Sequence, residues 1–183
     1  PPHNDFASYT WPPSVQALHM LVNEAAGGDS VIVDGWHVLT RLRDDEPQHF
    51  QALRRMPVPF REFDDDNETF TVAPMISCDR DDNIVALRFS NQLMQTLDPE
   101  GPGVADFYRA YRALCELVAD DAFKARFRLE GGDILVVAGH RVLHGREAFD
   151  AASRRHLQDA YFEHDNVRNH LEVLKRKGAR THG

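Results

Sequence analysis

Alternating apolar and polar residues in two parts of the chain predict a protein built mainly from β-strands. Near the beginning, Val15 to Val22 and Ser30 to Val33 are separated by the turn residues Gly27-Gly28. In the last third, the apolar run from Ile134 to Val137 and the alternating stretch 154–161 have the same character. Short runs of this kind between turn residues are typical of strands. We therefore expect strands in both parts of the chain.

The middle of the chain mixes helical and strand-like patterns. Apolar residues recur at helical spacing from Val104 to Leu117, which predicts a helix that packs outside the β-structure. Trp36 to Leu42 begins another helical stretch, and a third follows Pro47. The other expected elements are strands at Ala73 to Cys78 and Ile84 to Phe89, a loop from Asp64 to Asn67, a turn from Asp79 to Asn83, and a short closing helix from Val167 to Lys175.

Composition narrows the class of protein. The 183 residues are 42% hydrophobic and can bury one sizeable core, but no apolar run approaches the ~20 residues that span a bilayer, so we expect no membrane partner. Lys and Arg number 21 against 29 Asp and Glu, a net charge of −8, and nucleic acid is not an expected partner. Cys78 and Cys115 lack zinc-site or disulfide-framework spacing, and a reducing cytoplasm is the default location.

Two histidines and one aspartate are candidate metal ligands. His3 and Asp5 are two residues apart, and side chains at that spacing project from the same side of an extended strand. His144 follows the strand-like sequence Arg141-Val142-Leu143 and could supply a third ligand, although a buried structural histidine is the alternative. Fe(II) binds imidazole and carboxylate well, and such a triad leaves positions open for oxygen. Together these residues predict the iron site of an oxygenase.

Arg155 is the candidate partner of an oxidisable co-substrate. A keto acid that chelates the metal carries a distal carboxylate, and a guanidinium can donate two parallel hydrogen bonds to it. In a strand over 154–161, Arg155, Leu157 and Asp159 would share one face and Arg154 would lie on the other. Pairing with a surface carboxylate is the alternative for Arg155.

Short blocks along nearly the whole chain carry a family resemblance. They are Pro2-His3-Asn4-Asp5, Pro13 to His19, Gly27 to Ser30, Val33 to Trp36, Gly131 to Leu135, Arg141 to Arg146, Arg155 to Tyr161, and Asp165 to Arg168. In this order they resemble the γ-butyrobetaine dioxygenases, a branch of the taurine dioxygenase-like enzymes. The resemblance implies an α+β, mainly β fold, a double-stranded β-helix (jelly roll) with flanking helices. Residues 1–183 would form most of one catalytic domain, without the preceding strands and N-terminal domain of those relatives.

The resemblance also implies the chemistry and the residues that carry it. Fe(II) would be held by the catalytic residues His3, Asp5 and His144, and 2-oxoglutarate by Arg155 and Leu18. With O2, such an enzyme hydroxylates a small trimethylammonium compound, here a γ-butyrobetaine-like acid or a trimethylammonium phosphonate, and releases succinate and CO2. Aromatic faces hold quaternary ammonium groups. The implied substrate-binding residues are Tyr161, Phe6 and Asn91. Relatives commonly dimerise, so a homodimer is possible.

Two positions depart from the pattern of that family. Ala138-Gly139 stands where many relatives have Asp-Asn before the distal ligand block, and His140 could restore some of the lost hydrogen bonding. The segment Gln92 to Gln95 has no counterpart of an arginine that many relatives carry. Two alternatives follow. One is a taurine dioxygenase-like hydroxylase of an anionic sulfonate, phosphonate or amino acid, in which Tyr161 only packs. The other is a degenerate β-helix that binds a ligand or partner without turnover.

Overall fold

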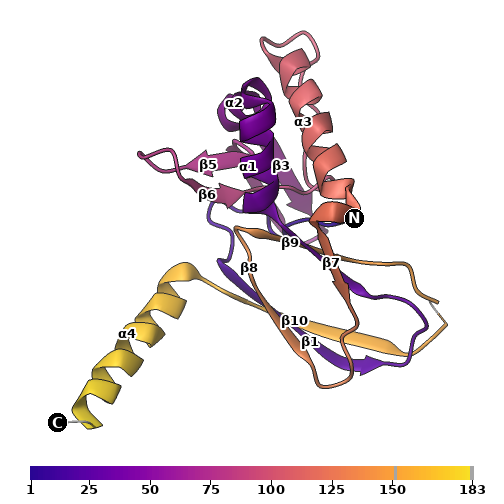
Figure 1. Cartoon of the computed structure of the whole chain (residues 1–183), viewed down its shortest axis with the longest axis vertical. Coiled ribbons are helices and arrows are strands. Elements are labelled where there is room, and N and C mark those ends of the chain that lie inside the picture. The colour runs from indigo at the N-terminus through magenta and orange to yellow at the C-terminus, as the bar shows by residue number, and fades with distance from the viewer. Residues whose placement is uncertain (151, 182–183) are drawn as a thin grey trace.

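The computed structural model describes residues 1–150 and 152–181, and most of its β-structure lies in two three-stranded antiparallel sheets (Figure 1). The first sheet, in spatial order, contains β10 (Arg155–Phe162), β1 (Val15–Asn23) and β8 (Ile134–Ala138). The second contains β7 (Lys124–Phe127), β2 (Ser30–Asp34) and β9 (Val142–Arg146). The strands expected near the beginning and in the last third are confirmed, and each sheet combines strands from both parts of the chain.

Alternate side chains of β1 point into the protein. Gln16, Leu18 and Met20 are buried, whereas the intervening Ala17 and His19 are only half-buried. This alternation is the two-residue period of a strand. Leu18 pairs with Asp159 of β10 in the antiparallel register. Directly paired residues project from the same face of a sheet. The inward face of β1 is thus continuous with the face of β10 that carries Asp159.

The turn between β1 and β2 depends on glycine. Gly27 and Gly28 have φ angles of +76° and +74°, in the left-handed region that disfavours other residues. A Cβ on Gly27 would also lie 2.7 Å from the carbonyl oxygen of Ala148. The backbone of the loop after β9 can approach this turn closely only because no side chain is present there.

Helices and two short hairpins lie at one end of the sheets, where they enclose the largest buried apolar cluster (Figure 1). The elements are α1 (Gly35–Asp45), α2 (Pro47–Arg55), α3 (Val104–Ala119) and the short 3-10 helix Asp121–Phe123. The largest fully buried side chains of the cluster include Leu39, Leu42, Phe50, Leu53, Phe60, Phe107 and Leu114. The three predicted helices are confirmed, and α3 packs against α1 and α2 outside the two sheets.

One predicted strand is only partly right because of a proline. The segment from Ala73 to Cys78 is divided after Ala73, since Pro74 has no amide hydrogen to donate to a ladder. The strands concerned are β3 (Val58–Phe63), β4 (Glu68–Ala73), β5 (Ile76–Cys78) and β6 (Ile84–Leu87). β3 pairs with β4 around the predicted loop, and β5 pairs with β6 around the predicted turn. The sequence pattern does not predict β3, which contains Pro59, nor β4 or β7.

The last helix is longer than predicted. α4 (His164–Thr181) extends beyond the predicted limits of Val167 and Lys175 at both ends. In Figure 1 it projects away from the sheets instead of closing over them, and Val167, Leu171 and Leu174 are exposed. No helix in the described part of the chain is long and apolar enough to cross a membrane.

Asp34 joins the start of α1 to the turn between β8 and β9. Its Oδ1 accepts hydrogen bonds from the backbone amides of Trp36, at 3.1 Å, and His37, at 3.4 Å, and so caps the helix. The guanidinium of Arg141 donates to both carboxylate oxygens. These hydrogen bonds from Arg141, foremost, hold the pKa of Asp34 below its usual value of 3.8, against the opposing effect of burial.

Replacement of Asp34 should reveal these two contributions separately. Asp34→Ala removes both the cap and the ion pair and should lower the free energy of unfolding by about 1–2 kcal/mol, whereas Asp34→Asn keeps a good cap and should cost about half as much. Because folding lowers this pKa, the charge stabilises the fold above pH 3.8, and its benefit is lost as the pH falls through the folded-state pKa. Urea unfolding between pH 3 and pH 7 measures both effects. This account would be contradicted if the difference in free energy of unfolding between Asp34→Asn and the unaltered protein grew as the pH fell.

Candidate metal centre and cavity

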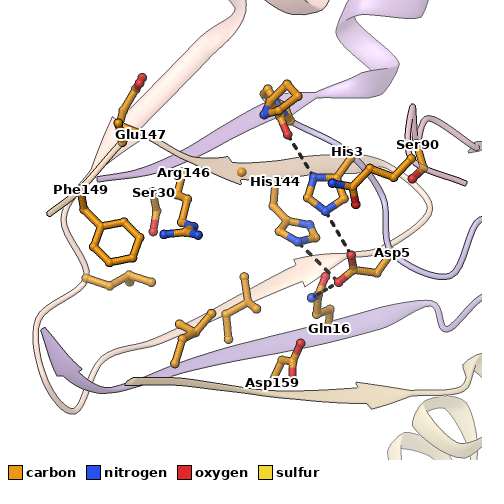
Figure 2. Close-up of a pocket in the computed structure, with 18 of the residues that line it drawn as sticks. His3, Asp5, Gln16, Ser30, Ser90, His144, Arg146, Glu147, Phe149 and Asp159 are labelled. Atoms are coloured by element: carbon orange, nitrogen blue, oxygen red, sulfur yellow. Dashed lines mark hydrogen bonds and ion pairs between the residues drawn. The ribbon is translucent and has the colours of Figure 1, made fainter. Parts of the chain in front are cut away.

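His3, Asp5 and His144 converge on one point (Figure 2). Nε2 of His3 is 3.3 Å from Oδ1 of Asp5, and Nε2 of His144 is 3.5 Å from Oδ2 of the same carboxylate. One possible ligand atom from each residue lies within 4.8 Å of the other two. Two imidazoles and one carboxylate at this spacing fit a single metal ion. They form the one group of three such side chains found among the described residues.

The backbone brings the two histidines together. The amide of His3 donates to the carbonyl of His144 at 2.9 Å, and the amide of His144 donates back at 3.0 Å, so the two residues form an antiparallel bridge beside β9. The expectation of one extended strand through His3 and Asp5 is only half right. Asp5 begins a turn, and Phe6 after it has a φ of 53°. The carboxylate therefore reaches the histidines because the chain turns.

Hydrogen bonds and nearby charge keep the carboxylate of Asp5 ionised. Burial raises its pKa, but the hydrogen bond with His3, the charge of His144 and the hydroxyl of Tyr161 outweigh burial and lower the pKa to about 2. Gln16 Nε2 also donates to Oδ2 at 2.7 Å. Burial, the largest influence, lowers the pKa of His144, which favours the neutral imidazole that binds metals. The hydrogen bond with Asp5 raises the pKa of His3.

Tyr161 links two carboxylates. Its hydroxyl lies 2.8 Å from Oδ2 of Asp5 and 2.5 Å from Oδ2 of Asp159, and it accepts a hydrogen bond from Gln16 at 3.2 Å. A hydroxyl has one proton, so it donates to only one of the two carboxylates at a time. Burial, followed by hydrogen bonds to Asp159 and Asp5, raises the pKa of Tyr161, which therefore stays protonated. Through its hydrogen bond to Asp5, the tyrosine contacts a candidate metal ligand directly.

An open cavity of about 700 Å³ extends from the triad between the two sheets. Its wall includes Leu18 from β1 and Arg155, Leu157 and Asp159 from β10. The prediction that these three β10 residues share one face is confirmed, because all three line the same space. Arg146, the last residue of β9, and Phe149, in the loop after it, lie at the end of the cavity opposite the triad in Figure 2.

The end of the cavity near Phe149 is cationic. The guanidinium of Arg146 lies 4.3 Å from the centre of the Phe149 ring, and that of Arg155 lies 5.3 Å from it. Nε of Arg155 is buried and has no hydrogen-bond partner among the described residues. Burial, and then the charges of Arg146 and Arg128, lower the pKa of Arg155. A buried donor without a partner beside a second cation is suited to an anionic ligand.

The three residues expected to bind a substrate are divided between two places. Asn91 lines the cavity, and its side-chain oxygen accepts a hydrogen bond from Tyr111. The rings of Phe6 and Tyr161 pack edge to face, with centroids 4.5 Å apart, and Tyr9 packs on Phe6 at 4.6 Å. Phe6 and Tyr161 stand beside Asp5 but are not part of the cavity wall.

Sequence reasoning missed several contacts of the site. Gln16 supports Asp5, and a polar residue on the otherwise apolar inward face of β1 was a signal that could have identified it. No comparable pattern singles out Arg146 or Phe149. His140 does not support the triad as expected, because its ring nitrogen Nε2 bonds to the carbonyl of Pro12 at 2.8 Å.

Comparison with known proteins identifies the relatives of this chain. Residues 1–161 match the family described as "Taurine catabolism dioxygenase TauD, TfdA family". Gamma-butyrobetaine dioxygenases of Pseudomonas sp. (strain AK-1) and Homo sapiens are 34% and 33% identical, over 96% of this chain and over 46% and 47% of their own lengths. Trimethyllysine dioxygenase of Meyerozyma guilliermondii is 27% identical, over 94% of this chain and 44% of its own. The chain thus spans about half the length of these relatives.

Solved structures with a similar fold are also oxygenases. Non-heme iron oxygenase OrfP in complex with Fe and alpha-ketoglutaric acid has a TM-score of 0.66 and 19% identity, over 89% of this chain and 49% of that one. Asparagine oxygenase in complex with Fe(II), 3-hydroxyasparagine and succinate has a TM-score of 0.68 and 20% identity, over 88% and 49%. These likenesses confirm the predicted jelly-roll fold. The match over residues 1–161 shows that the chain belongs to the taurine catabolism dioxygenase TauD, TfdA family.

Proposed function

We propose that this chain is the catalytic part of an Fe(II)- and 2-oxoglutarate-dependent dioxygenase that hydroxylates a small trimethylammonium compound. The observation that carries the proposal is the arrangement of one cavity. A triad of metal-binding side chains stands at one end, and the guanidinium of Arg155, whose buried Nε has no hydrogen-bond partner among the described residues, faces the same space. Each part suits one half of a keto acid that chelates iron and extends a carboxylate away from it.

The triad fits Fe(II). His3, Asp5 and His144 would hold the ion through two imidazole nitrogens and an ionised carboxylate, the donor set typical of non-heme iron oxygenases with open positions. The low pKa of Asp5 keeps its oxygens available as donors at neutral pH. Gln16 and Tyr161 hold one of these oxygens by hydrogen bonds and so limit rotation of the carboxylate.

The cavity fits 2-oxoglutarate. Arg155 would donate hydrogen bonds to the distal carboxylate, Arg146 would add positive charge, and Leu18 would contact the methylene groups from the sheet. With iron bound, O2 would be the oxidant: one oxygen atom would be taken up in the oxidative decarboxylation of 2-oxoglutarate to succinate and CO2, and the other would enter the C–H bond that is hydroxylated. The protein's own contribution is placement, since it must hold one C–H bond of the substrate near the triad and keep others away.

The substrate class is argued from aromatic rings and from relatives. Phe6 and Tyr161 pack together beside Asp5, outside the wall of the cavity, and aromatic rings this close to the triad suit a quaternary ammonium group, which cannot donate a hydrogen bond. Asn91 would contact the polar end of the substrate from the cavity wall. The names of the relatives, gamma-butyrobetaine dioxygenase and trimethyllysine dioxygenase, support a trimethylammonium compound. A γ-butyrobetaine-like acid and a trimethylammonium phosphonate both fit this description.

Metal binding should require the triad. His144→Ala should lower the affinity for Co(II), a spectroscopic substitute for Fe(II), by roughly 100-fold or more, because it removes a ligand outright. His19→Ala is the matched control, since His19 lies on β1 between the inward-facing Leu18 and Met20 and belongs to no metal-binding group among the described residues. Anaerobic titration followed by visible absorption measures both. Equal affinity of His144→Ala and the unaltered protein would show that the triad does not hold the metal, and no binding to either would argue for a β-helix that binds no metal.

Arg155 should determine affinity for the co-substrate. Arg155→Gln should raise the KM for 2-oxoglutarate by about 10- to 100-fold, because it removes charge-assisted hydrogen bonds, with a smaller effect on kcat. Arg154→Gln is the control, because exposed Arg154 pairs with Glu24. Succinate formation at varied co-substrate concentration gives both constants. A KM that stays within twofold in Arg155→Gln would remove this assignment.

Variants of Tyr161 should show whether the substrate site recognises a quaternary ammonium group through aromatic rings or recognises an anion. The protein should prefer a trimethylammonium substrate over its primary amine analogue, by about 2- to 30-fold for each aromatic face. Tyr161→Phe keeps the ring but loses the bond to Asp5, so it should slow turnover of every substrate without changing this ratio. Tyr161→Leu should reduce the ratio. Succinate assays with both analogues and with taurine-like anions measure it, and selective turnover of the anions would favour the alternative hydroxylase.

A further inference from the structure

Asn4 lies between two proposed metal ligands, yet its side chain points away from them into the protein. It is 6% exposed, and it belongs neither to the triad nor to the wall of the 700 Å³ cavity. A buried amide must find partners for one acceptor and two donor hydrogens, because an unpaired group would cost its full desolvation. The partners of Asn4 therefore show what its burial accomplishes.

Every polar group of this side chain is used. Its oxygen accepts a hydrogen bond from the amide of Phe89 at 2.9 Å, while its own backbone amide donates to the carbonyl of Phe89 at 2.9 Å. Its side-chain nitrogen donates to the carbonyls of Gly139, at 2.8 Å, and Val142, at 3.3 Å. One amide thus joins the His3 to Asp5 segment to two distant parts of the chain.

Both distant segments belong to the site. Val142 begins β9 and precedes His144 by two residues, so the position of its backbone fixes where the third ligand starts. Phe89 precedes Ser90 and Asn91, which line the cavity. The Asn4 side chain consequently ties His3 and Asp5 both to the strand that carries His144 and to the segment that carries Asn91.

Position 139 cannot supply this support with a side chain of its own. A Cβ on Gly139 would lie 2.7 Å from the carbonyl oxygen of Pro13, a separation that real Cβ atoms do not adopt. The amide of Gly139 is occupied as well, because it donates to the carbonyl of Ser14 at 2.8 Å. The side chain that holds the carbonyl groups of Gly139 and Val142 therefore comes from outside the turn between β8 and β9, and it is that of Asn4.

We propose that Asn4 is a positioning residue for the candidate metal centre, holding His3 and Asp5 in register with His144. The inference rests on the proposed function, because it assigns Asn4 a role toward the metal. Asparagine suits the position because an aspartate would place a negative charge against two carbonyl oxygens, and a leucine of similar size would leave three polar groups without partners.

The test compares Asn4→Leu and Asn4→Thr with Ser8→Ala. Ser8 is an equally buried polar residue a few positions along, but it bonds to Thr69 at 2.7 Å and touches no ligand. Co(II) affinity and its visible absorption spectrum report the ligand geometry, and thermal unfolding of the metal-free proteins reports general damage. Asn4→Leu should bind Co(II) about 10- to 100-fold more weakly with an altered spectrum. Asn4→Thr, which keeps one donor, should lose less, and Ser8→Ala should bind as the unaltered protein does.

Three outcomes would overturn the inference. One is unaltered Co(II) affinity and spectrum in Asn4→Leu or, if that variant does not fold, in Asn4→Thr. The second is an equal loss of affinity in Ser8→Ala at matched thermal stability, since the effect would then be general. The third is failure of the unaltered protein to bind Co(II), which would also refute the proposed function and is distinguished by the absence of any metal signal.

Discussion

Two backbone hydrogen bonds between His3 and His144 are the constraint on which the rest of the site depends. They are short, mutual and independent of side-chain identity, and they place residues from opposite ends of the chain next to each other beside β9. Once the backbones of His3 and His144 are fixed in this way, rotation of the two side chains is enough to bring both imidazoles to a common point. The carboxylate of Asp5 then needs only the turn that begins at that residue.

The cavity is polar at both ends, with opposite signs. Asp5 and Asp159 share the hydroxyl of Tyr161 near the histidines, whereas Arg146 and Arg155 share the ring of Phe149 at the other end. Leucines contribute to the wall as well. Such a cavity favours an anionic group at the arginine end, because the same group beside Asp5 and Asp159 would meet like charges unless a metal ion lay between them.

Much of this arrangement could be predicted from the sequence because it depends on local patterns. The period of two in β1 and β10 gave the strands and the shared face of Arg155 and Asp159, and the order of short blocks indicated the jelly-roll fold. The turn at Asp5 could not be predicted, because it is held by Asn4 bonding to Phe89 and Gly139, which are distant in sequence. The shared hydroxyl of Tyr161 was likewise hidden, since it depends on the relative placement of three elements.

The cluster of Arg128, Arg146 and Arg155 stands in a chain whose net charge is −8. An anion far from the protein is therefore repelled, while one inside the cavity is attracted. Salt screens the first effect more than the second, because the Debye length is about 8 Å at physiological ionic strength and partly buried charges are screened less. Moderate salt should consequently raise the association rate of an anionic ligand and leave most of its binding affinity intact. Added ions usually have the opposite effect, because they weaken the binding of anions to basic sites.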